Sequence, residues 1–320
     1  MPEPAGWLRE LGRTGLTVSA ITAGGAPLGS MPENFGYEVQ EPDAVLLVEA
    51  ILASPIRVID TANGYSSGRS EERIGKAIAH CGGLPNDFLI TTKVDARGED
   101  YSGNRVLQSV RESRQRLGID TLELVYLHDP EFHDFDDLTA PNGAVQTLAR
   151  LRDDGEVKHI GLAGGDVHEM ERYLDTGLFE VLLVHNRWTL VDRSADQLIS
   201  DARLAGVAVV NAAVYGGGIL ARDLGETTNY GYRPAAAETL QAIASMSRLC
   251  ERFGIDLATA AMQWSLRDER IASTVIGFSK PERITSIMRA ATTKLPEPFW
   301  SELEELVPAR ANWLDFQNVR

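Results

Sequence analysis

Short apolar segments alternate with longer amphipathic segments along most of this chain. The apolar segments are rich in β-branched and small residues, as in V-V-N-A-A and S-T-V-I-G, which is typical of strands buried on both faces. The predicted strands are Val18–Gly24, Val58–Asp60, Phe88–Val94, Leu122–His128, His159–Ala163, Val181–His185, Val207–Ala212 and Ala272–Gly277. The predicted helices that follow them are Asp43–Ala53, Ser70–His80, Arg105–Leu117, Ala144–Asp154, Val167–Leu174, Ala195–Ala205, Ala236–Phe253 and Pro281–Ala291.

This alternation predicts one closed α/β barrel. Eight strands, each followed by a helix, fit a (β/α)8 TIM barrel better than an open doubly wound sheet, which needs fewer strands or a second domain. No Pro-rich or Ser-rich linker divides the chain, so residues 1–320 are predicted to form one domain. Additional helices are expected at Asp256–Leu266 and Pro298–Leu306, in the C-terminal part of the chain.

Three further segments complete the predicted architecture. Leu8–Val18 contains two strand-like pieces around Gly12 to Gly15, which indicates a β-hairpin ahead of the barrel. Glu131–Pro141 and Asp223–Pro234 are long enough to form loops at the rim of the barrel.

Composition narrows the class of protein. Hydrophobic residues make up 43% and charged residues 24%, as in soluble globular proteins, and the net charge of −15 disfavours nucleic acid as a partner. The two cysteines, Cys81 and Cys250, provide neither a disulfide framework nor metal-ligand spacing, which favours a reducing compartment. Neither a signal-peptide core nor a bilayer-spanning apolar run is visible. We therefore expect a cytoplasmic protein without a metal site or membrane contact.

Polar side chains recur at the ends of the predicted strands. They are Asp60, Lys93, His128, His185 and Asn186, with Tyr65 on the loop that follows Asp60. Each has an ordinary explanation: Asp60 caps a loop, Lys93 forms a structural ion pair with Asp60, and His128 is a core histidine. The C-terminal ends of parallel barrel strands, however, converge on one rim. The presence of Asp60, Tyr65, Lys93 and His128 at matching ends therefore favours a catalytic site.

These four side chains suggest proton transfer beside a polarised carbonyl or alcohol. A phenol with a pKa of about 10 is a poor acid or base at neutral pH, and a nearby ammonium lowers that pKa. Lys93 is therefore predicted to lower the pKa of Tyr65, while Asp60 holds Lys93 in place and His128 donates a hydrogen bond to a substrate oxygen. None of these groups carries a hydride, so a nicotinamide cofactor is predicted.

Two loops are candidates for holding the phosphates of such a cofactor. The chain contains neither G-x-G-x-x-G after a first strand nor G-x-x-x-x-G-K-[ST]. Instead, the last strand leads into I-G-F-S-K-P-E-R, where the amides around Gly277 and the side chains of Ser279, Lys280 and Arg283 can surround a phosphate at a helix start. The alternative is an ordinary helix start with a proline. The glycine-rich Y-G-G-G-I-L, Tyr215 to Leu220, allows close backbone approach to a pyrophosphate.

From Leu11 to about Ala290 the chain resembles the aldo-keto reductases. The resemblance rests on Asp60, Tyr65, Lys93 and His128, which match the family's catalytic tetrad in order. It also rests on R-E-L-G-R-T-G-L-T-V, S-E-E-R-I-G-K-A-I and L-Q-S-V-R-E-S-R-Q-R-L-G-I-D-T-L-E-L-V-Y-L-H. L-H-D-P and R-W-T-L-V-D-R are most similar to the sugar dehydrogenase branch, which acts on L-fucose, D-threo-aldoses or L-galactose and to which pyridoxal 4-dehydrogenase is related.

The resemblance also implies a set of cofactor contacts. Ser279, Lys280 and Arg283 would meet the 2′-phosphate of NADP, while Ser286-Ile287 replace the usual Glu-Asn pair at the adenine. At the nicotinamide, Ala163-Gly164 replace Ser-Asn, His185 replaces Gln, and Ala212 replaces the stacking Tyr, a role left to Tyr215 or Trp188. The predicted contacts are Gly25, Ala26, Asp60, Ala163, Gly164, His185, Tyr215, Gly216, Gly218, Leu220, Ile276, Gly277, Ser279, Lys280 and Arg283.

Together these features predict an NAD(P)-dependent oxidoreductase of a small polar carbonyl or alcohol. The resemblance implies an aldose hemiacetal or an aldehyde as substrate, Tyr65 as proton donor or acceptor, NADP as cofactor with NAD as the alternative, and a monomer or small homo-oligomer. Two other hypotheses stay open. One is a barrel aldolase or lyase that uses Lys93 as a Schiff base, and the other is a non-catalytic nucleotide sensor with the same fold.

Overall fold

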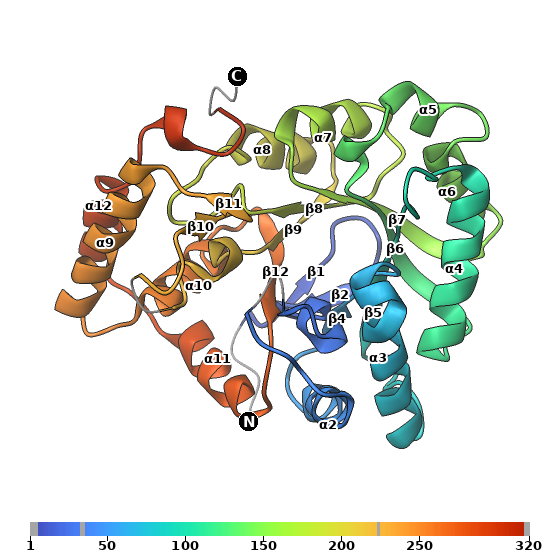
Figure 1. The fold of residues 1–320 in the computed structure, drawn as a ribbon, viewed down its shortest axis with the longest axis horizontal. Helices are drawn as coiled ribbons and strands as arrows, with labels where there is room; N and C mark the ends of the chain where they lie inside the picture. The colour runs from blue at the N-terminus through green and yellow to red at the C-terminus, as the bar shows by residue number, and fades with distance from the viewer. Residues whose placement is uncertain (1–5, 33–35, 223–224, 317–320) are drawn as a thin grey trace.

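The predicted eight-stranded parallel barrel is confirmed (Figure 1). The computed structural model describes residues 6–32, 36–222 and 225–316. Neighbouring strands pair in sequence order, and the last strand closes the barrel against the first. The barrel strands are β3 (Ile21–Gly24), β4 (Val58–Asp60), β5 (Leu89–Val94), β6 (Leu122–His128), β7 (Val157–Gly164), β8 (Val181–His185), β9 (Ala208–Ala212) and β12 (Ile271–Gly277).

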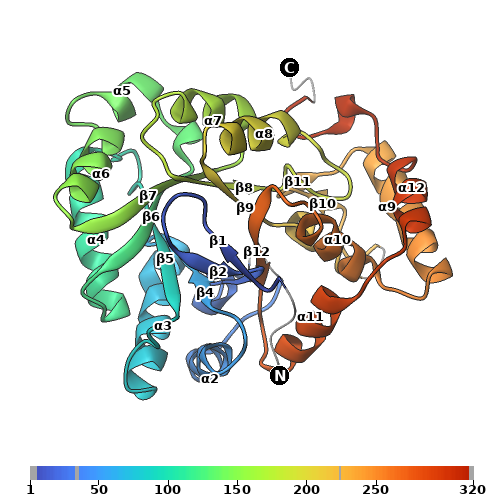
Figure 2. The ribbon, with the colours of Figure 1, turned by 180° about the vertical axis from the view of Figure 1, so that it is seen from behind.

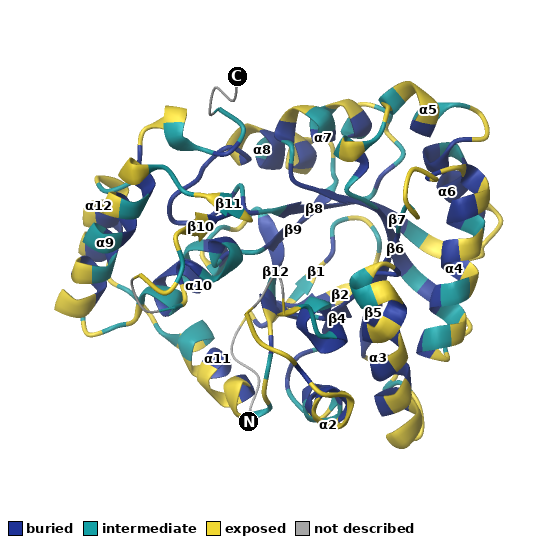
Figure 3. Cartoon of the chain, viewed as in Figure 1, coloured by how far each residue is buried: buried dark blue, intermediate teal, exposed yellow. Residues whose placement is uncertain are grey.

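A ring of helices surrounds the barrel, with buried inner faces and exposed outer faces (Figures 1 and 3). Within the described residues, no helix has both the length and the apolar character needed to cross a membrane. The helices are α2 (Glu41–Leu52), α3 (Arg69–His80), α4 (Gly103–Leu117), α5 (Phe135–Thr139), α6 (Ala144–Asp153), α7 (Val167–Leu174), α8 (Asp196–Leu204), α9 (Ala237–Arg252), α10 (Leu257–Leu266), α11 (Glu282–Thr292) and α12 (Glu297–Glu304).

The two segments predicted to be rim loops contain short regular elements. Helix α5 lies in the first of them and begins where the Asp134 side chain accepts a hydrogen bond from the Asp137 amide. Its five residues are too few to give a recognisable apolar period. The second contains the two-stranded ribbon of β10 (Asn229–Tyr230) and β11 (Arg233–Pro234), while its residues 223 and 224 lie outside the described part.

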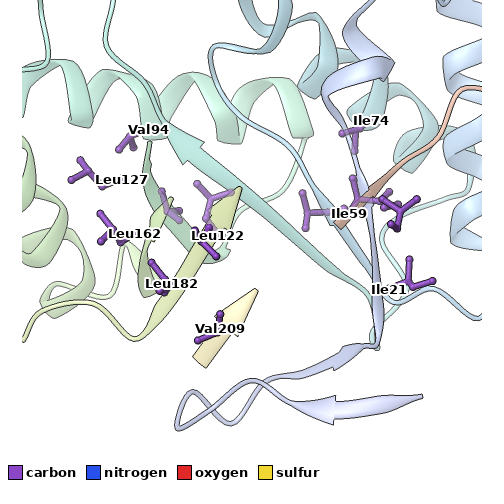
Figure 4. Close-up of a cluster of buried hydrophobic side chains, with 14 of the residues drawn as sticks. Ile21, Ile59, Ile74, Val94, Leu122, Leu127, Leu162, Leu182 and Val209 are labelled. Carbon is purple, nitrogen blue, oxygen red and sulfur yellow. The ribbon is translucent and has the colours of Figure 1, made fainter. Parts of the chain in front are cut away.

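Alternate residues of each barrel strand enter two different apolar clusters, as expected for strands buried on both faces. On β6, Leu124 and Tyr126 face the barrel interior, while Val125 and Leu127 pack against the helices. The outer cluster is continuous around the barrel, and Figure 4 shows Leu127 near its counterparts from other strands. Because both faces are filled, the polar side chains at the strand ends are held by a rigid frame.

The β-hairpin predicted ahead of the barrel is present. It closes the N-terminal end of the barrel and crosses the centre of the helix ring in Figure 2. Its strands are β1 (Leu8–Glu10) and β2 (Thr17–Ser19). Leu11 and Val18 of the hairpin pack among interior residues of the barrel. The prediction of one strand over Val18–Gly24 is wrong, because the Ala20 amide bonds to the Trp7 carbonyl and keeps the chain in the hairpin until Ile21. With this end closed, ligand access is left to the opposite rim.

Gly75 marks the closest approach of helices α3 and α4. A Cβ at this position would lie 2.0 Å from the backbone oxygen of Arg116. Gly75→Ala should therefore destabilise the protein by about 1–3 kcal/mol through overpacking, although alanine favours an exposed helix. The check is the free energy of unfolding in denaturant, with Glu72→Ala on the exposed face of α3 as the control. A stabilised Gly75→Ala protein would contradict this packing.

Candidate active site

The four side chains predicted to form a site do come together at the C-terminal ends of the barrel strands. Lys93 on β5 lies 2.6 Å from Asp60 Oδ2 on β4, and its side chain is only 1% exposed. Its remaining two protons point to the Thr61 carbonyl oxygen at 2.7 Å and the Tyr65 hydroxyl at 3.3 Å. Thr91 donates to Asp60 Oδ1 at 2.8 Å and fixes that carboxylate. The ammonium is therefore held by three groups, one of which is the phenol.

A strained loop carries Tyr65 over the barrel rim. After β4, the small residues Ala62 to Gly64 allow a turn, and the next two positions, Ser66 and Ser67, adopt positive φ values of 52° and 57°. Non-glycine residues seldom occupy this region, which is strained and is often found at functional sites. The conformation is secured by the Ser66 hydroxyl, which donates to the Ser30 carbonyl. The loop thus brings the Tyr65 ring over the Lys93 ammonium, 4.8 Å from the ring centroid.

Tyr65 is a neutral phenol in this environment. Burial raises its pKa well above the usual value, and the carboxylates of Asp60, Asp129 and Asp95 raise it further. The net direction is opposite to the predicted lowering of the pKa, because burial of the ring raises the pKa most and the surrounding carboxylates add to it. A phenol that keeps its proton at neutral pH is suited to donating it to a developing alkoxide.

His128 lies beside Tyr65 at the end of β6. The two rings meet edge to face with centroids 5.7 Å apart. The imidazole Nδ1 is 2.6 Å from Asp95 Oδ1, and the His128 amide donates to the Tyr101 hydroxyl at 2.9 Å. Burial lowers the pKa of His128, but Asp129 and Asp95 outweigh it and leave the pKa above its usual value. His128 therefore offers an N–H donor beside the phenol.

Two acidic residues that follow His128 shape the mouth of the site together with His185. One side-chain nitrogen or oxygen atom from each of Asp129, Glu131 and His185 lies within 4.8 Å of the other two. Asp129 Oδ1 and Glu131 Oε2 are inaccessible to water and lack hydrogen-bond partners among the described residues, with His185 Nε2 3.5 Å from Asp129 Oδ1. Asp129 also adopts a positive φ of 44°. The Asp129 side chain is nevertheless 37% exposed, so its carboxylate places a hydrogen-bond acceptor at the mouth.

The Glu131 carboxylate occupies space left by the glycines after β7. Its Oε1 accepts a hydrogen bond from the Gly165 amide at 2.6 Å. A Cβ on Gly164 would lie 2.6 Å from Glu131 Oε2, so any larger residue would displace the carboxylate. Ala163 is buried and its carbonyl accepts from the Asp129 amide at 2.7 Å. Of the three positions that the resemblance assigned to the nicotinamide amide, only His185 presents a polar side chain here.

A cavity of about 670 Å³ lies between the loop after β9 and helices α9 to α11. Tyr215, Leu220 and Arg283, all predicted cofactor contacts, line it together. Burial raises the pKa of Tyr215 to about 12, against the opposing effect of Arg283. The Arg283 guanidinium can bind an anionic group of a nucleotide. The cavity is therefore a candidate for the adenosine end of a nicotinamide dinucleotide.

The glycine-rich loop after β9 is built for close backbone approach. Gly216, Gly217 and Gly218 have φ values of 60°, 78° and 109°, which strongly favour glycine. A Cβ on Gly216 would lie 2.5 Å from the Tyr230 ring. Glycine at these positions leaves the backbone of Gly217 and Gly218, which are both half-buried, free of side chains, as the close approach of a pyrophosphate requires.

The remaining predicted contacts lie either at the rim between β12 and β4 or in the segment that follows β12. The Gly25 amide donates a hydrogen bond to the Asp60 carbonyl oxygen at 2.7 Å. A Cβ on Gly277 would lie 3.3 Å from Pro27. Both glycines therefore lie at the rim between β12 and β4. Ala26 and Ile276 lie in the same region, Ala26 in the short helix after β3 and Ile276 on β12. Ser279 hydrogen-bonds with the Tyr37 side chain. Lys280 is exposed and is not among the residues that line the cavity.

Trp188 does not face the candidate site. Its side chain is buried and packs against Trp264 with ring centroids 5.6 Å apart. The guanidinium groups of Arg193 and Arg270 lie 5.5 and 4.9 Å from its ring centroid. This packing engages the Trp188 ring and favours Tyr215, which lines the cavity, as the replacement for a stacking tyrosine.

Sequence reasoning missed three site residues: Asp95, Asp129 and Glu131. Each lies one to three residues beyond a residue that was recognised, Lys93 or His128, and thus on the same rim. These residues could have been found by including the first residues of the loop after each strand, because these loops lie at the same rim as the strand ends. Which of these carboxylates would point into the site depends on positive φ values and glycine contacts that no pattern reveals.

Comparisons with known proteins agree with this geometry. The aldo/keto reductase family model matches residues 20–308. Similar proteins are pyridoxal 4-dehydrogenase of Microbacterium luteolum, 31% identical over 92% of this chain and 96% of the relative, and D-threo-aldose 1-dehydrogenase of a Pseudomonas species, 28% identical over 92% and 96%. L-galactose dehydrogenase of Arabidopsis thaliana is 30% identical over 89% and 88%. These names match the predicted sugar dehydrogenase branch.

The fold has a counterpart among solved structures. An aldo-keto reductase from Bacillus halodurans superposes with a TM-score of 0.79 and 22% identity over 97% of this chain and 99% of that one. The family match includes all eight barrel strands, and pyridoxal 4-dehydrogenase is covered over 96% of its length. The chain therefore belongs to the aldo/keto reductase family.

Proposed function

We propose that this NAD(P)-dependent oxidoreductase transfers a hydride between nicotinamide and the carbonyl carbon of an aldose or aldehyde, with Tyr65 as the proton donor or acceptor. The observation that carries the proposal is the placement of the Tyr65 hydroxyl 3.3 Å from a buried ammonium and beside an imidazole N–H. A neutral phenol in that position can protonate a substrate oxygen.

Each side chain has a distinct part in the reaction. A bound nicotinamide supplies the hydride or accepts it. In reduction, Tyr65 gives its proton to the substrate oxygen as the carbonyl becomes an alcohol, and Lys93 stabilises the phenolate left behind. His128 donates a hydrogen bond to the same oxygen, and Asp60 holds Lys93. Oxidation of an alcohol uses the same groups in reverse.

Polyhydroxylated substrates are supported by the mouth of the site. Hydroxyl groups donate strong hydrogen bonds to carboxylates, and the mouth offers the carboxylate of Asp129, whose side chain is 37% exposed. Two of the similar proteins carry an aldose in their names, D-threo-aldose 1-dehydrogenase and L-galactose dehydrogenase. An aldose hemiacetal, oxidised at its anomeric carbon, is therefore the substrate class that we propose.

NADP is the proposed cofactor, and we attribute the preference for NADP over NAD to Arg283. Arg283 lines the cavity, whereas Lys280 does not, so the two basic residues that looked equivalent in sequence are separated by the structure. Arg283→Ala should weaken NADPH by roughly 10- to 100-fold, the loss of one charge-assisted contact, while NADH changes little.

The check is to measure the dissociation constants of NADPH and NADH by fluorescence titration. The proteins compared are the native protein, Arg283→Ala and the control Lys280→Ala. Lys280→Ala should change the ratio of NADPH to NADH affinity much less than Arg283→Ala. Equal native affinities for the two cofactors, or equal weakening of both by Arg283→Ala, would make NAD the better assignment.

The geometry disfavours the two alternative functions. A Schiff base requires a free amine, but the Lys93 ammonium directs its three protons at Asp60, the Thr61 carbonyl and Tyr65. A nucleotide sensor does not need a phenol beside that ammonium. Borohydride trapping in the presence of substrate separates the aldolase from the oxidoreductase. The cytoplasmic location and the monomeric or small homo-oligomeric state stay predictions from the sequence.

A further inference from the structure

We infer that Asp95 is a positioning residue for His128, which it holds in a fixed orientation with a proton on Nδ1, and that it ties this ring to the loop that carries Tyr65. The inference rests on the proposed function for its role in turnover. Asp95 follows β5 and was not among the residues predicted to form the site.

One carboxylate joins the two halves of the proton-transfer pair. Asp95 Oδ1 lies 2.6 Å from His128 Nδ1, and Asp95 Oδ2 accepts the Gly64 amide hydrogen at 2.6 Å. Gly64 is the residue before Tyr65, so the same side chain sets the imidazole and the start of the tyrosine loop. Charge-assisted hydrogen bonds of this length are among the strongest in proteins. A shift of the His128 ring would therefore also displace the loop that carries Tyr65, and a shift of the loop would displace the ring.

Gly64 leaves the space that this carboxylate needs. A Cβ on Gly64 would lie 2.9 Å from Asp95 Cγ and 3.0 Å from Asp95 Oδ1. The φ of Gly64 is −80°, which any residue can adopt, so glycine is required here for space and not for backbone conformation. The close packing makes the Asp95 orientation specific.

The hydrogen bond to Asp95 determines which nitrogen of His128 serves the site. A carboxylate only accepts, so Nδ1 carries a proton and Nε2 is left to face the mouth, 3.8 Å from Asp129 Oδ2. The ionisable groups around the ring are Asp95, Asp129, Lys93, Tyr65 and Tyr101. The two carboxylates outweigh burial and Lys93 and raise the pKa of His128, so both ring nitrogens are donors over a wider pH range.

Asp95→Asn separates the positioning role from simple attachment of the loop. Asparagine keeps an oxygen for the Gly64 amide but replaces the acceptor of the His128 proton with an NH2 group and removes the charge. We expect kcat for carbonyl reduction to fall about 10- to 100-fold with little change in KM. The loss of activity at rising pH should begin at a lower pH than in the native enzyme, because His128 gives up its proton sooner.

NMR titration of 15N-labelled histidines measures the same effect without turnover. The His128 signals should titrate at lower pH in Asp95→Asn, while those of His159, which pairs with Glu180 at the other end of β7, should be unchanged by the substitution. The charge-matched control is Asp87→Asn, which removes an exposed carboxylate that forms an ion pair with Arg57. This substitution should leave kcat and the His128 signals as in the native enzyme.

An unchanged His128 titration in Asp95→Asn would overturn the inference, whether or not kcat falls, because Asp95 would then act only as a loop attachment. If Asp95→Asn does not fold, the native protein decides: the His128 Nδ1 proton should give a far-downfield, slowly exchanging signal, and its absence would overturn the inference. Failure of the proposed function would appear differently, as a native protein without turnover but with this histidine behaviour intact.

Discussion

Replacing Tyr65 with phenylalanine should lower turnover by about 100-fold or more, because the substitution removes the only group we place to transfer the proton. The ring is retained, and so are its edge-to-face contact with His128 and its position over Lys93. Folding and cofactor binding should therefore survive. Two quantities are to be measured for the native protein and for Tyr65→Phe. They are kcat with the best aldose or aldehyde and the dissociation constant of the cofactor.

A second phenol near the mouth provides the control. Tyr232 lies between β10 and β11, is 55% exposed, and contributes to the electrostatic field at Tyr65. Tyr232→Phe should change kcat far less than Tyr65→Phe. If the two substitutions cost the same, or Tyr65→Phe leaves turnover near normal, the proton comes from another group and the assignment of Tyr65 is wrong.

Lys93→Met should reduce both stability and activity. Asp60 would keep its charge in a site where its side chain is 6% exposed, and breaking a buried pair in this way costs about 3–5 kcal/mol. Activity falls as well, because nothing then stabilises the Tyr65 phenolate formed during reduction. Removing the ammonium should move the basic limb of the pH–rate profile upward, because Lys93 lowers the pKa of His128, whose loss of a proton ends activity at rising pH.

The double variant Asp60→Asn/Lys93→Met separates the two effects. Asparagine can still accept the hydrogen bond from Thr91 but leaves no unpaired charge. The free energy of unfolding should recover much of the loss, whereas kcat should stay as low as in Lys93→Met. Recovery of both quantities would mean that Lys93 serves only to neutralise Asp60.

The sequence was most informative where a single pattern dictated the structure. Buried strands such as Leu122–His128 are short runs whose two faces both meet apolar neighbours, so hydrophobicity alone located them. Because parallel strands end on one rim, Asp60, Lys93 and His128 could be placed together before any coordinates. The Asp60–Lys93 ion pair follows from the same rule.

What could not be predicted depends on backbone detail and on the sum of many charges. The Tyr65 pKa is raised because Asp129 and Asp95 add to burial, and the position of Asp129 depends on a positive φ. Trp188 looked available for stacking, but tertiary packing places it against Trp264. Lys280 and Arg283, three residues apart, were expected to face one ligand, yet only Arg283 lines the cavity.

Direct transfer of a hydride is the central claim, and isotope transfer tests it most directly. The enzyme would be supplied with NADPH that carries deuterium at the transferable position of the nicotinamide, together with an aldehyde or open-chain aldose, and the product analysed by mass spectrometry. The account predicts one deuterium on the former carbonyl carbon, formed at a rate that falls at least about 100-fold in Tyr65→Phe. Product without the label, or labelled product formed equally fast by Tyr65→Phe, would contradict it.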